Sequence, residues 1–340
     1  MRVLVLGGSG YVGRKLLEAL RAMPWALPAC ASRGRVDKKT DGVEYVCVDT
    51  RDLIAMTAAL KGFDSVVNCV AGDERSISEG ASVLIRAALA ANCRRIVHVS
   101  TMSVYGLAEG FISEDAPLDI GAGWYGRAKC EAESSMREFS RSGGETVTLR
   151  PGCVFGPGSE LWVGRIARWL RAGRLGDLGV AGDGWSNLVH IDDVCRALVS
   201  SLQLPLIAGQ FPVFNLAAPD SPRWNDYFVD LALELKAVPV KRISPLQLKL
   251  DTCAISPPLK VVQRAFKSVG LAKPGLPDPM PPGLARLWAQ HIRLDATLAR
   301  HTLGLTWTPY MTGLKNSAEW AVKACAPHTL LHDKPLFTPG

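Results

Sequence analysis

Two side chains capable of proton chemistry lie four residues apart at the start of a predicted helix. Tyr125 and Lys129 form a Tyr-x-x-x-Lys pair in the segment 125–141, and this spacing places both on one helix face. A phenol has a reference pKa of about 10, which a neighbouring ammonium lowers by favouring the phenolate. Thr101 ends a predicted strand upstream and can hydrogen-bond the same substrate oxygen as Tyr125. These three residues predict proton exchange with a hydroxyl or carbonyl oxygen.

A glycine-rich loop follows the first predicted strand, residues 2–6 (RVLVL). It contains Gly7, Gly10 and Gly13, and Tyr11 and Val12 open the predicted helix behind it. This spacing suits a tight turn, close approach of the backbone to a pyrophosphate and close helix–strand packing. The helix N-terminus adds amide donors and a positive dipole end for the phosphates. The loop therefore predicts a dinucleotide site.

The end of the second predicted strand indicates which dinucleotide binds. An acidic residue there, about 20 residues past the loop, would hold the ribose 2′-hydroxyl of NAD, but the chain has none. Ser32 and Arg33 suit a 2′-phosphate instead, with Arg35 as a second candidate, which favours NADP(H) over the alternative NAD(H). The other interpretation of Arg33 is a solvated loop charge. Asp49, after the third strand, is placed to meet the adenine edge.

Short apolar runs alternate with helical patterns through the first half of the chain. The predicted strands are 2–6, 27–32, 43–48, 65–70, 95–100 and 146–149, and the predicted helices are 11–22, 53–60, 82–91 and 125–141. Continuous apolar strands alternating with helices imply a parallel sheet covered on both faces. We therefore expect a doubly wound α/β fold with its ligands at the carboxyl ends of the strands.

The second half of the chain is less regular. A helix over 190–202 and a strand over 213–217 are expected to join the sheet, irregular lid-like structure is expected over 257–282, which holds seven prolines, and a helix over 284–303. We expect residues 1–155, with elements from about 186–218, to form the dinucleotide-binding domain. Residues 156–185 and 219–340 are then the smaller, mostly carboxyl-terminal substrate-binding region.

Composition excludes several classes of protein. The 340 residues carry a net charge of +7 without a nucleic-acid motif, and no apolar run reaches the roughly 18 residues of a membrane span. We therefore expect no nucleic-acid or membrane partner. The nine cysteines are odd in number and lack CxxC pairs, which predicts reduced thiols, no metal site and a cytoplasmic location. One basic series fits either a solvated helix face or an anion-binding strip: Arg165, Arg168, Arg171 and Arg174.

Taken together, these motifs resemble the extended short-chain dehydrogenase/reductase superfamily, the NAD(P)-dependent epimerases, dehydratases and reductases. The resemblance extends from residue 1 to about 322 and includes segments 68–72, 149–158, 182–193 and 303–320. It implies a Rossmann-type sheet and a catalytic set of Thr101, Tyr125 and Lys129, the last two also contacting the cofactor. It further implies a small-molecule substrate, a homodimer that pairs the helices bearing residues 82–91 and Tyr125, and cofactor contacts from Val70, Ala71, Pro151 and Val154.

Departures from the family patterns narrow the reaction. Met102 and Ser103 follow Thr101, where the sugar dehydratases have Asp-Glu, so water elimination is not expected. Residues 185–187 (Trp-Ser-Asn) stand where nucleotide-sugar epimerases commonly have an arginine for a phosphate. We therefore expect an NADP(H)-dependent oxidoreductase acting on a carbonyl or secondary alcohol. The alternatives are an NAD(P)-dependent nucleotide-sugar epimerase and a non-catalytic NADP-sensing scaffold.

Overall fold

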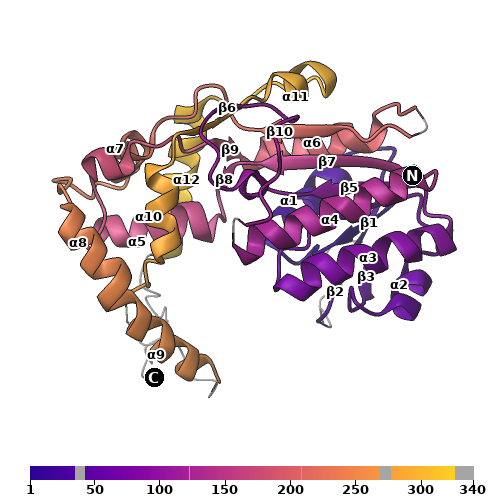
Figure 1. The fold of residues 1–340 in the computed structure, drawn as a ribbon, viewed down its shortest axis with the longest axis horizontal. Helices are drawn as coiled ribbons and strands as arrows, with labels where there is room; N and C mark the ends of the chain where they lie inside the picture. Colours follow the sequence, from indigo (N-terminus) through magenta and orange to yellow (C-terminus); the bar gives the residue numbers. More distant parts are fainter. Residues whose placement is uncertain (35–42, 122, 208, 269–276, 326–340) are drawn as a thin grey trace, which may run out of the picture.

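A seven-stranded parallel sheet forms the centre of the molecule. This computed structural model describes residues 1–34, 43–121, 123–207, 209–268 and 277–325. The strand order is β10-β7-β5-β4-β1-β2-β3 (Figure 1). The order reverses between β1 and β4, so the predicted doubly wound, Rossmann-type fold is confirmed. The strands are β1 (Arg2–Leu6), β2 (Leu27–Ser32), β3 (Glu44–Cys47), β4 (Ser65–Asn68), β5 (Arg95–Val99), β7 (Glu145–Pro151) and β10 (Val213–Leu216).

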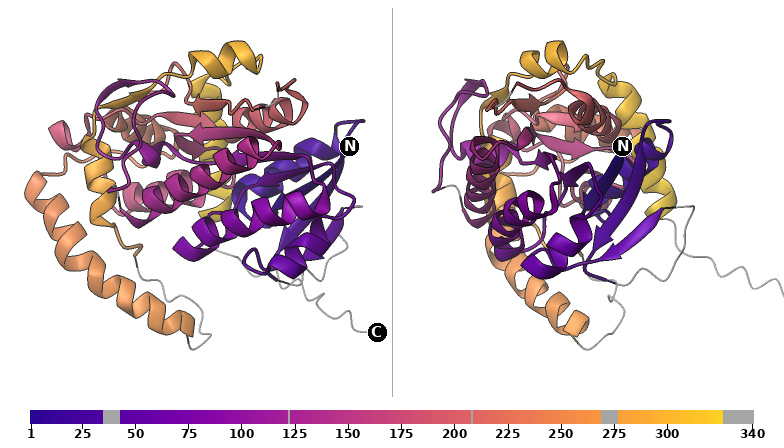
Figure 2. Two further views of the ribbon diagram at one scale, coloured as in Figure 1. Left: turned by 45° about the vertical axis from the view of Figure 1, so that its right-hand side comes forward. Right: turned by 90° about the vertical axis from the view of Figure 1, so that its right-hand side faces the viewer.

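Helices cover both faces of this sheet (Figure 2). One face carries α1 (Tyr11–Arg21) and α6 (Ile191–Gln203), and the other carries α2 (Leu53–Leu60), α3 (Glu74–Ala91) and α4 (Trp124–Arg141). Each helix buries an apolar stripe, as α1 does with Leu16, Leu17 and Leu20. Burying such a side chain contributes about 1.5–3 kcal/mol. The strands, covered on both sides, leave their ends to receive ligands.

A second hydrophobic core lies beside the sheet, on the left in Figure 1. It is built from α5 (Arg165–Arg171), α7 (Trp224–Glu234), α10 (Pro282–Ala289) and α12 (Tyr310–Cys325). Three fully buried tryptophans lie at its centre: Trp169, Trp224 and Trp288. Two small parallel sheets connect it to the main sheet, pairing β6 (Gly110–Ile112) with β11 (Ile292–Leu294) and β8 (Cys153–Phe155) with β9 (Leu188–His190).

The prediction of irregular structure over 257–282 is wrong for its first part. There α9 (Ser256–Ser268) forms, and Pro257 and Pro258 stand in its first turn, where a helix needs no amide donor. Residues 269–276 lie outside the described part of the chain. These two prolines therefore stand where the π turn η4 (Asp251–Ile255) passes into α9, within one continuous helical run.

The expected helix over 284–303 is also wrong. It divides into α10, β11 and α11 (Thr297–Thr302). The strand forms because residues 110–112, far away in sequence, offer a parallel pairing edge. Periodicity along one segment does not contain that partner.

Two of the four spaced arginines join segments that are distant in sequence. Arg168 Nε donates to Asp278 Oδ2 at 2.5 Å, and Arg174 Nε donates to Asp251 Oδ2 at 2.9 Å. Both carboxylates are nearly buried. The two pairs hold Asp251 and Asp278, which flank α9 in the chain, against α5 and the turn after it. Arg168 and Arg174 are therefore neither a solvated helix face nor an anion-binding strip.

A buried ion pair joins α4 to the sheet. Arg150 at the end of β7 donates from Nε and Nη2 to the Glu133 carboxylate at 3.0 and 2.7 Å, and both side chains are only 3% exposed. Arg150 also donates to the Tyr105 hydroxyl at 2.8 Å, and the Ser100 hydroxyl donates to Glu133 at 2.5 Å. The Glu133 carboxylate is therefore paired with a counter-charge and hydrogen-bonded, as a buried charge requires.

Replacing Glu133 by alanine should destabilise the fold by about 3–5 kcal/mol, because Arg150 is then left buried without its counter-charge. The matched control is Glu131→Ala, an exposed glutamate of the same helix, which should cost less than about 0.5 kcal/mol. Urea unfolding of both variants measures this difference. Equal losses would mean that the pair does not stabilise the fold.

Candidate active site

The glycine loop is shaped by close backbone contacts at the end of β1. Gly7 has a φ of +74°, a conformation that glycine adopts freely. A Cβ on Gly13 would lie 2.3 Å from the Gly7 carbonyl oxygen, so no side chain fits there. Helix α1 begins after Gly10 with no side-chain cap and no acidic residue in its first turn. Its first amides therefore remain available to an anion.

A pocket of about 430 Å³ lies against this loop. It contains most of the predicted cofactor residues: Gly7, Gly10, Tyr11, Val12, Gly13, Ser32, Arg33, Val70 and Ala71. Thr50 also lines it and was missed from sequence; its buried hydroxyl has no partner in the part of the chain described. Three features of the pocket fit a dinucleotide: this orphaned hydroxyl, the uncapped helix N-terminus and the side formed by the loop glycines, which have no side chains.

Not every predicted cofactor residue lines this pocket. Asp49 does not, since Arg51 holds its carboxylate through the guanidinium and the amide. Arg35 lies outside the described residues. Pro151 ends β7 and Val154 lies in β8, and neither residue lines this pocket. For these positions the cofactor contacts stay predictions.

Arg33 stands at the mouth of the pocket, more than half exposed. Its Nη1 lies 3.6 Å from Oδ2 of Asp73. Asp73 caps α3, and the hydroxyl and amide of Ser76, with a further contribution from Arg33, hold its pKa down to about 2. The carboxylate is therefore charged at neutral pH and keeps the guanidinium near the pocket through a weak, solvated pair.

Lys129 is held between the ends of two strands. Its Nζ donates to the carbonyl oxygens of Val70 and Val99 at 3.0 and 2.6 Å. The side chain is 1% exposed, and burial lowers its pKa to about 8, against the opposing effects of Cys69 and Glu133. An ammonium has three donors, so one remains beyond these two bonds.

The strand end that receives Lys129 is itself fixed by side chains. Asn68 Oδ1 accepts from the Val70 amide at 3.1 Å, and Asn68 Nδ2 lies 3.2 Å from Nδ1 of His98. His98 is buried, and burial together with the Lys129 charge lowers its pKa well below the usual range. It is therefore neutral and orients Asn68 without adding a second cation.

Tyr125 lies one helical turn before Lys129, in the first turn of α4, and thus beyond the carboxyl end of β5. Its phenol packs against the core on the α3–α4 face, and burial raises its pKa. The sequence predicts a pKa lowered by the neighbouring ammonium and the positive nicotinamide of a bound cofactor together; among the protein's own groups, desolvation of the phenolate decides and raises it. The phenol is protonated at neutral pH.

Thr101 lies two residues past the end of β5 and caps the short 3₁₀ helix η1 (Met102–Tyr105). Its hydroxyl accepts from the Ser103 amide at 3.2 Å and lies 3.3 Å from the Ser103 hydroxyl. Thr101 is nearly buried, whereas Ser103 lines a further pocket. The structure thus adds Ser103 to the hydroxyls near the candidate catalytic set.

That further pocket, also of about 430 Å³, lies where η1, the start of α4 and α10 come together. Apolar side chains dominate its lining, which comprises Met102, Ser103, Gly106, Leu107, Gly121, Gly123, Gly283, Arg286, Leu287, Gln290 and Ile292. Gln290 donates to the carbonyls of Gly106 and Ala108, both at 2.9 Å, and so attaches α10 to the loop after η1. Arg286, which sequence reasoning missed, is the cation of this lining; no motif marks it.

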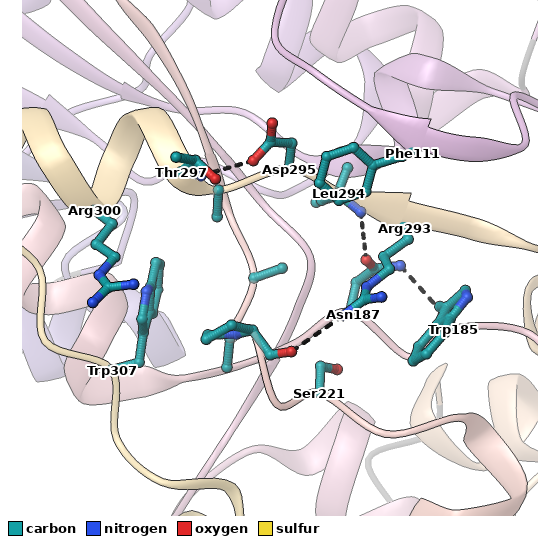
Figure 3. Close-up of a pocket in the computed structure, with 14 residues that line it drawn as sticks. Phe111, Trp185, Asn187, Ser221, Arg293, Leu294, Asp295, Thr297, Arg300 and Trp307 are labelled. Carbon is teal, nitrogen blue, oxygen red and sulfur yellow. Dashed lines mark hydrogen bonds between the residues drawn. The ribbon is translucent and has the colours of Figure 1, made fainter.

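The segment 185–187 has a structural task (Figure 3). Asn187 donates from Nδ2 to β11 at 2.8 Å and accepts from β11 at 2.9 Å. Trp185 packs under the guanidinium groups of Arg293 and Arg223, at 4.4 and 4.7 Å. The small pocket drawn there, about 170 Å³, is lined by Trp185, Asn187 and Arg293 and also by Arg300 and Trp307.

Comparison with known proteins identifies the family. A sequence model described as "NAD dependent epimerase/dehydratase family" matches residues 3–217, more than half of the chain. The chain belongs to this family. Family members are NAD(P)-dependent oxidoreductases and epimerases of the extended short-chain dehydrogenase/reductase superfamily, as the sequence motifs indicated.

Similar proteins include two bacterial reductases. The chain is 30% identical over 227 residues to a 3-diazoavenalumate denitrifying reductase of Streptomyces sp, covering 60% of this chain and 72% of the relative. It is 31% identical over 215 residues to a 2-alkyl-3-oxoalkanoate reductase of Stenotrophomonas maltophilia (strain K279a), covering 58% and 64%. Among solved structures, MoeE5 in complex with UDP-glucuronic acid and NAD superposes with a TM-score of 0.70 at 22% identity, covering 95% and 100% of the two chains. At that identity the structural likeness shows the fold alone.

The described residues contain neither a cluster of metal-ligand side chains nor a membrane-spanning helix. No group of three or more His, Cys, Asp or Glu there could hold a metal ion. No helix within the same ranges is long and apolar enough to span a bilayer. The predicted homodimer stays a prediction.

The buried ammonium of Lys129 should leave a signature in the pH dependence of stability. Its pKa is about 8 in the fold against 10.5 when unfolded, so between these values the unfolded chain binds the extra proton and this residue's contribution to stability rises with pH. The rise amounts to roughly 3 kcal/mol at about 1.4 kcal/mol per pKa unit.

Unfolding free energies of the protein and of Lys129→Met, measured across this window, isolate the contribution as their difference. The difference should change in favour of the lysine protein as pH increases. A difference that is constant with pH would contradict the lowered pKa.

Proposed function

We propose that this family member is an NADP(H)-dependent oxidoreductase that interconverts a ketone and a secondary alcohol. The observation that carries the proposal is a mainly apolar pocket lined by Met102 and Ser103, which follow Thr101 in the chain, and by Gly123, two residues before Tyr125. A substrate there meets hydroxyl donors at one end and hydrocarbon along its length. The two reductases reported above support this choice of chemistry.

The preference for NADP(H) rests on the end of β2. Ser32 and Arg33 line the cofactor pocket, and the position offers no carboxylate to a ribose 2′-hydroxyl. The Ser32 hydroxyl donates to the Gly34 carbonyl at 3.0 Å, which holds the turn on which Arg33 stands. A guanidinium with only a weak partner at 3.6 Å can turn to a phosphate, a stronger acceptor.

The chain's residues then divide the reduction among them. Bound NADPH supplies the hydride to the carbonyl carbon. The Tyr125 phenol gives its proton to the carbonyl oxygen, so a C–H and an O–H bond form while the C=O π bond is lost, and the phenolate regains a proton from solvent. Thr101 hydrogen-bonds and orients the same oxygen. Lys129 places a positive charge near the developing phenolate and uses its remaining N–H to hold the cofactor ribose.

A nucleotide-sugar epimerase is the second candidate, favoured by Arg286, a cation in the pocket between η1 and α10 that could meet a phosphate. Against it, Trp185 and Asn187 are occupied in holding β11 and its arginine. The two reactions differ in stoichiometry, because an epimerase consumes no cofactor overall.

Tyr125→Phe should lower turnover by about 10²–10⁴-fold, because the phenylalanine ring cannot supply the proton. NADPH affinity should stay within about twofold, since the ring and its packing remain. NADPH oxidation with a panel of apolar ketones measures turnover, and fluorescence titration measures affinity. Tyr45→Phe, at a partly exposed tyrosine of β3, is the control and should leave both unchanged.

Two results would contradict this proposal. Full activity of the Tyr125 variant would remove the proton-transfer role. Interconversion of UDP-sugars without net NADPH oxidation would replace the reductase by the epimerase.

Arg33→Ala should weaken NADPH binding by about 10- to 100-fold, the range expected for losing a charge-assisted hydrogen bond of about 1.5–3 kcal/mol. NADH binding should not change, because it lacks the 2′-phosphate. Arg75→Ala is the matched control, an exposed arginine of α3 that pairs with Glu79 and does not line the pocket. Parallel losses for both cofactors would mean that Arg33 does not recognise the 2′-phosphate.

A further inference from the structure

The helices between residues 245 and 268 form an arm that leaves the body of the molecule (Figures 1 and 2, orange). It consists of α8 (Pro245–Leu250), the π turn η4 (Asp251–Ile255) and α9. Its inner side is attached to α5 by the Arg174–Asp251 pair, and Leu248, Thr252 and Ser256 are buried. Its outer side has no such cover among the described residues.

Apolar side chains run along that outer side. Leu246 and Leu250 are one helical turn apart, the wider π turn brings Ile255 into line with them, and Val262 follows two turns later. These four side chains are between 39% and 67% exposed, and Val261 beside them is 65% exposed. Exposed aliphatic side chains that lie together in this way mark a binding surface.

Positive charge accompanies this apolar stripe. Residues 245–268 contain four basic residues and one acidic residue, a net charge of +3. The acidic residue, Asp251, is nearly buried and already paired with Arg174. Lys249 and Lys260 are exposed on the arm itself.

We infer that this arm docks the protein onto the surface of an anionic lipid bilayer. An exposed apolar stripe flanked by lysines is the pattern of a helix that lies in the lipid interface, where the aliphatic groups enter the acyl boundary and the cations meet the headgroups. A second copy of the chain would bring one +3 segment against another, which charge repulsion opposes. A nucleic acid would use the cations and leave the aliphatic stripe in water.

This inference departs from the sequence-based expectation of no membrane partner. That expectation came from the lack of a spanning segment, and interfacial docking needs none. The part of the arm from residue 257 onward was also expected to be irregular from its prolines, so its amphipathic character was not visible. The inference does not depend on the proposed reaction.

Vesicle flotation with the full-length protein tests it. Vesicles of equal parts phosphatidylcholine and phosphatidylserine should bind the protein, vesicles of phosphatidylcholine alone should not, and high salt should reverse the binding. Leu246→Ser/Leu250→Ser and Lys249→Glu/Lys260→Glu should each lower the partition coefficient by at least about tenfold. The control pair, Ile54→Ser/Lys61→Glu, changes an exposed isoleucine and lysine at α2 and should bind as the unchanged protein does.

All substituted side chains are exposed, and circular dichroism melting curves should show that the variants remain folded. Absence of vesicle binding, equal binding to both vesicle types, or equal losses for arm and control variants would overturn the inference. Sedimentation velocity provides the remaining comparison: concentration-dependent dimers that disappear in the arm variants, without vesicle binding, would assign the surface to a second copy instead.

Discussion

Burial of two opposite charges on one helix determines how the candidate site is held. Lys129 and Glu133 are four residues apart on α4, so they lie one above the other on the face that meets the sheet. Lys129 bonds to the ends of β4 and β5, and Glu133 bonds to Ser100 after β5 and to Arg150 at the end of β7. A charge removed from water must be met by fixed partners, so α4 has one position along these strands. Tyr125, on the same helix, takes its place from that constraint.

The sequence predicts the parts whose determinants are local. The glycine loop depends on contacts among Gly7, Gly10 and Gly13 within seven residues, and the Tyr125–Lys129 pair depends on one helical turn. The alternation of apolar strands and helices likewise predicts a parallel sheet, because a strand buried on both faces is predominantly apolar along its whole length. For these features, neighbouring residues contain the information.

The features that sequence reasoning missed depend on partners far away along the chain. Ile292–Leu294 becomes a strand only because Gly110–Ile112 lies beside it. Arg286 lines the pocket between η1 and α10 because Gln290 attaches α10 to the loop after η1. The Tyr125 pKa departs from the sequence-based expectation for a related reason. Pair spacing shows which charge lies near, but the degree of burial, set by the whole fold, decides whether desolvation exceeds it.

The two perturbed titrations have a joint chemical consequence. Burial raises the pKa of Tyr125 and lowers that of Lys129 to about 8. Below pH 8 the phenol is therefore protonated and the lysine is an ammonium. A protonated phenol is the form that donates to a carbonyl, and the phenolate it leaves is stabilised only while the nearby ammonium keeps its charge. Under the proposed function, reduction therefore starts from both groups in the protonation states in which the fold holds them below pH 8. The same burial that fixes α4 on the sheet thus sets the protonation states from which the proposed proton transfer begins.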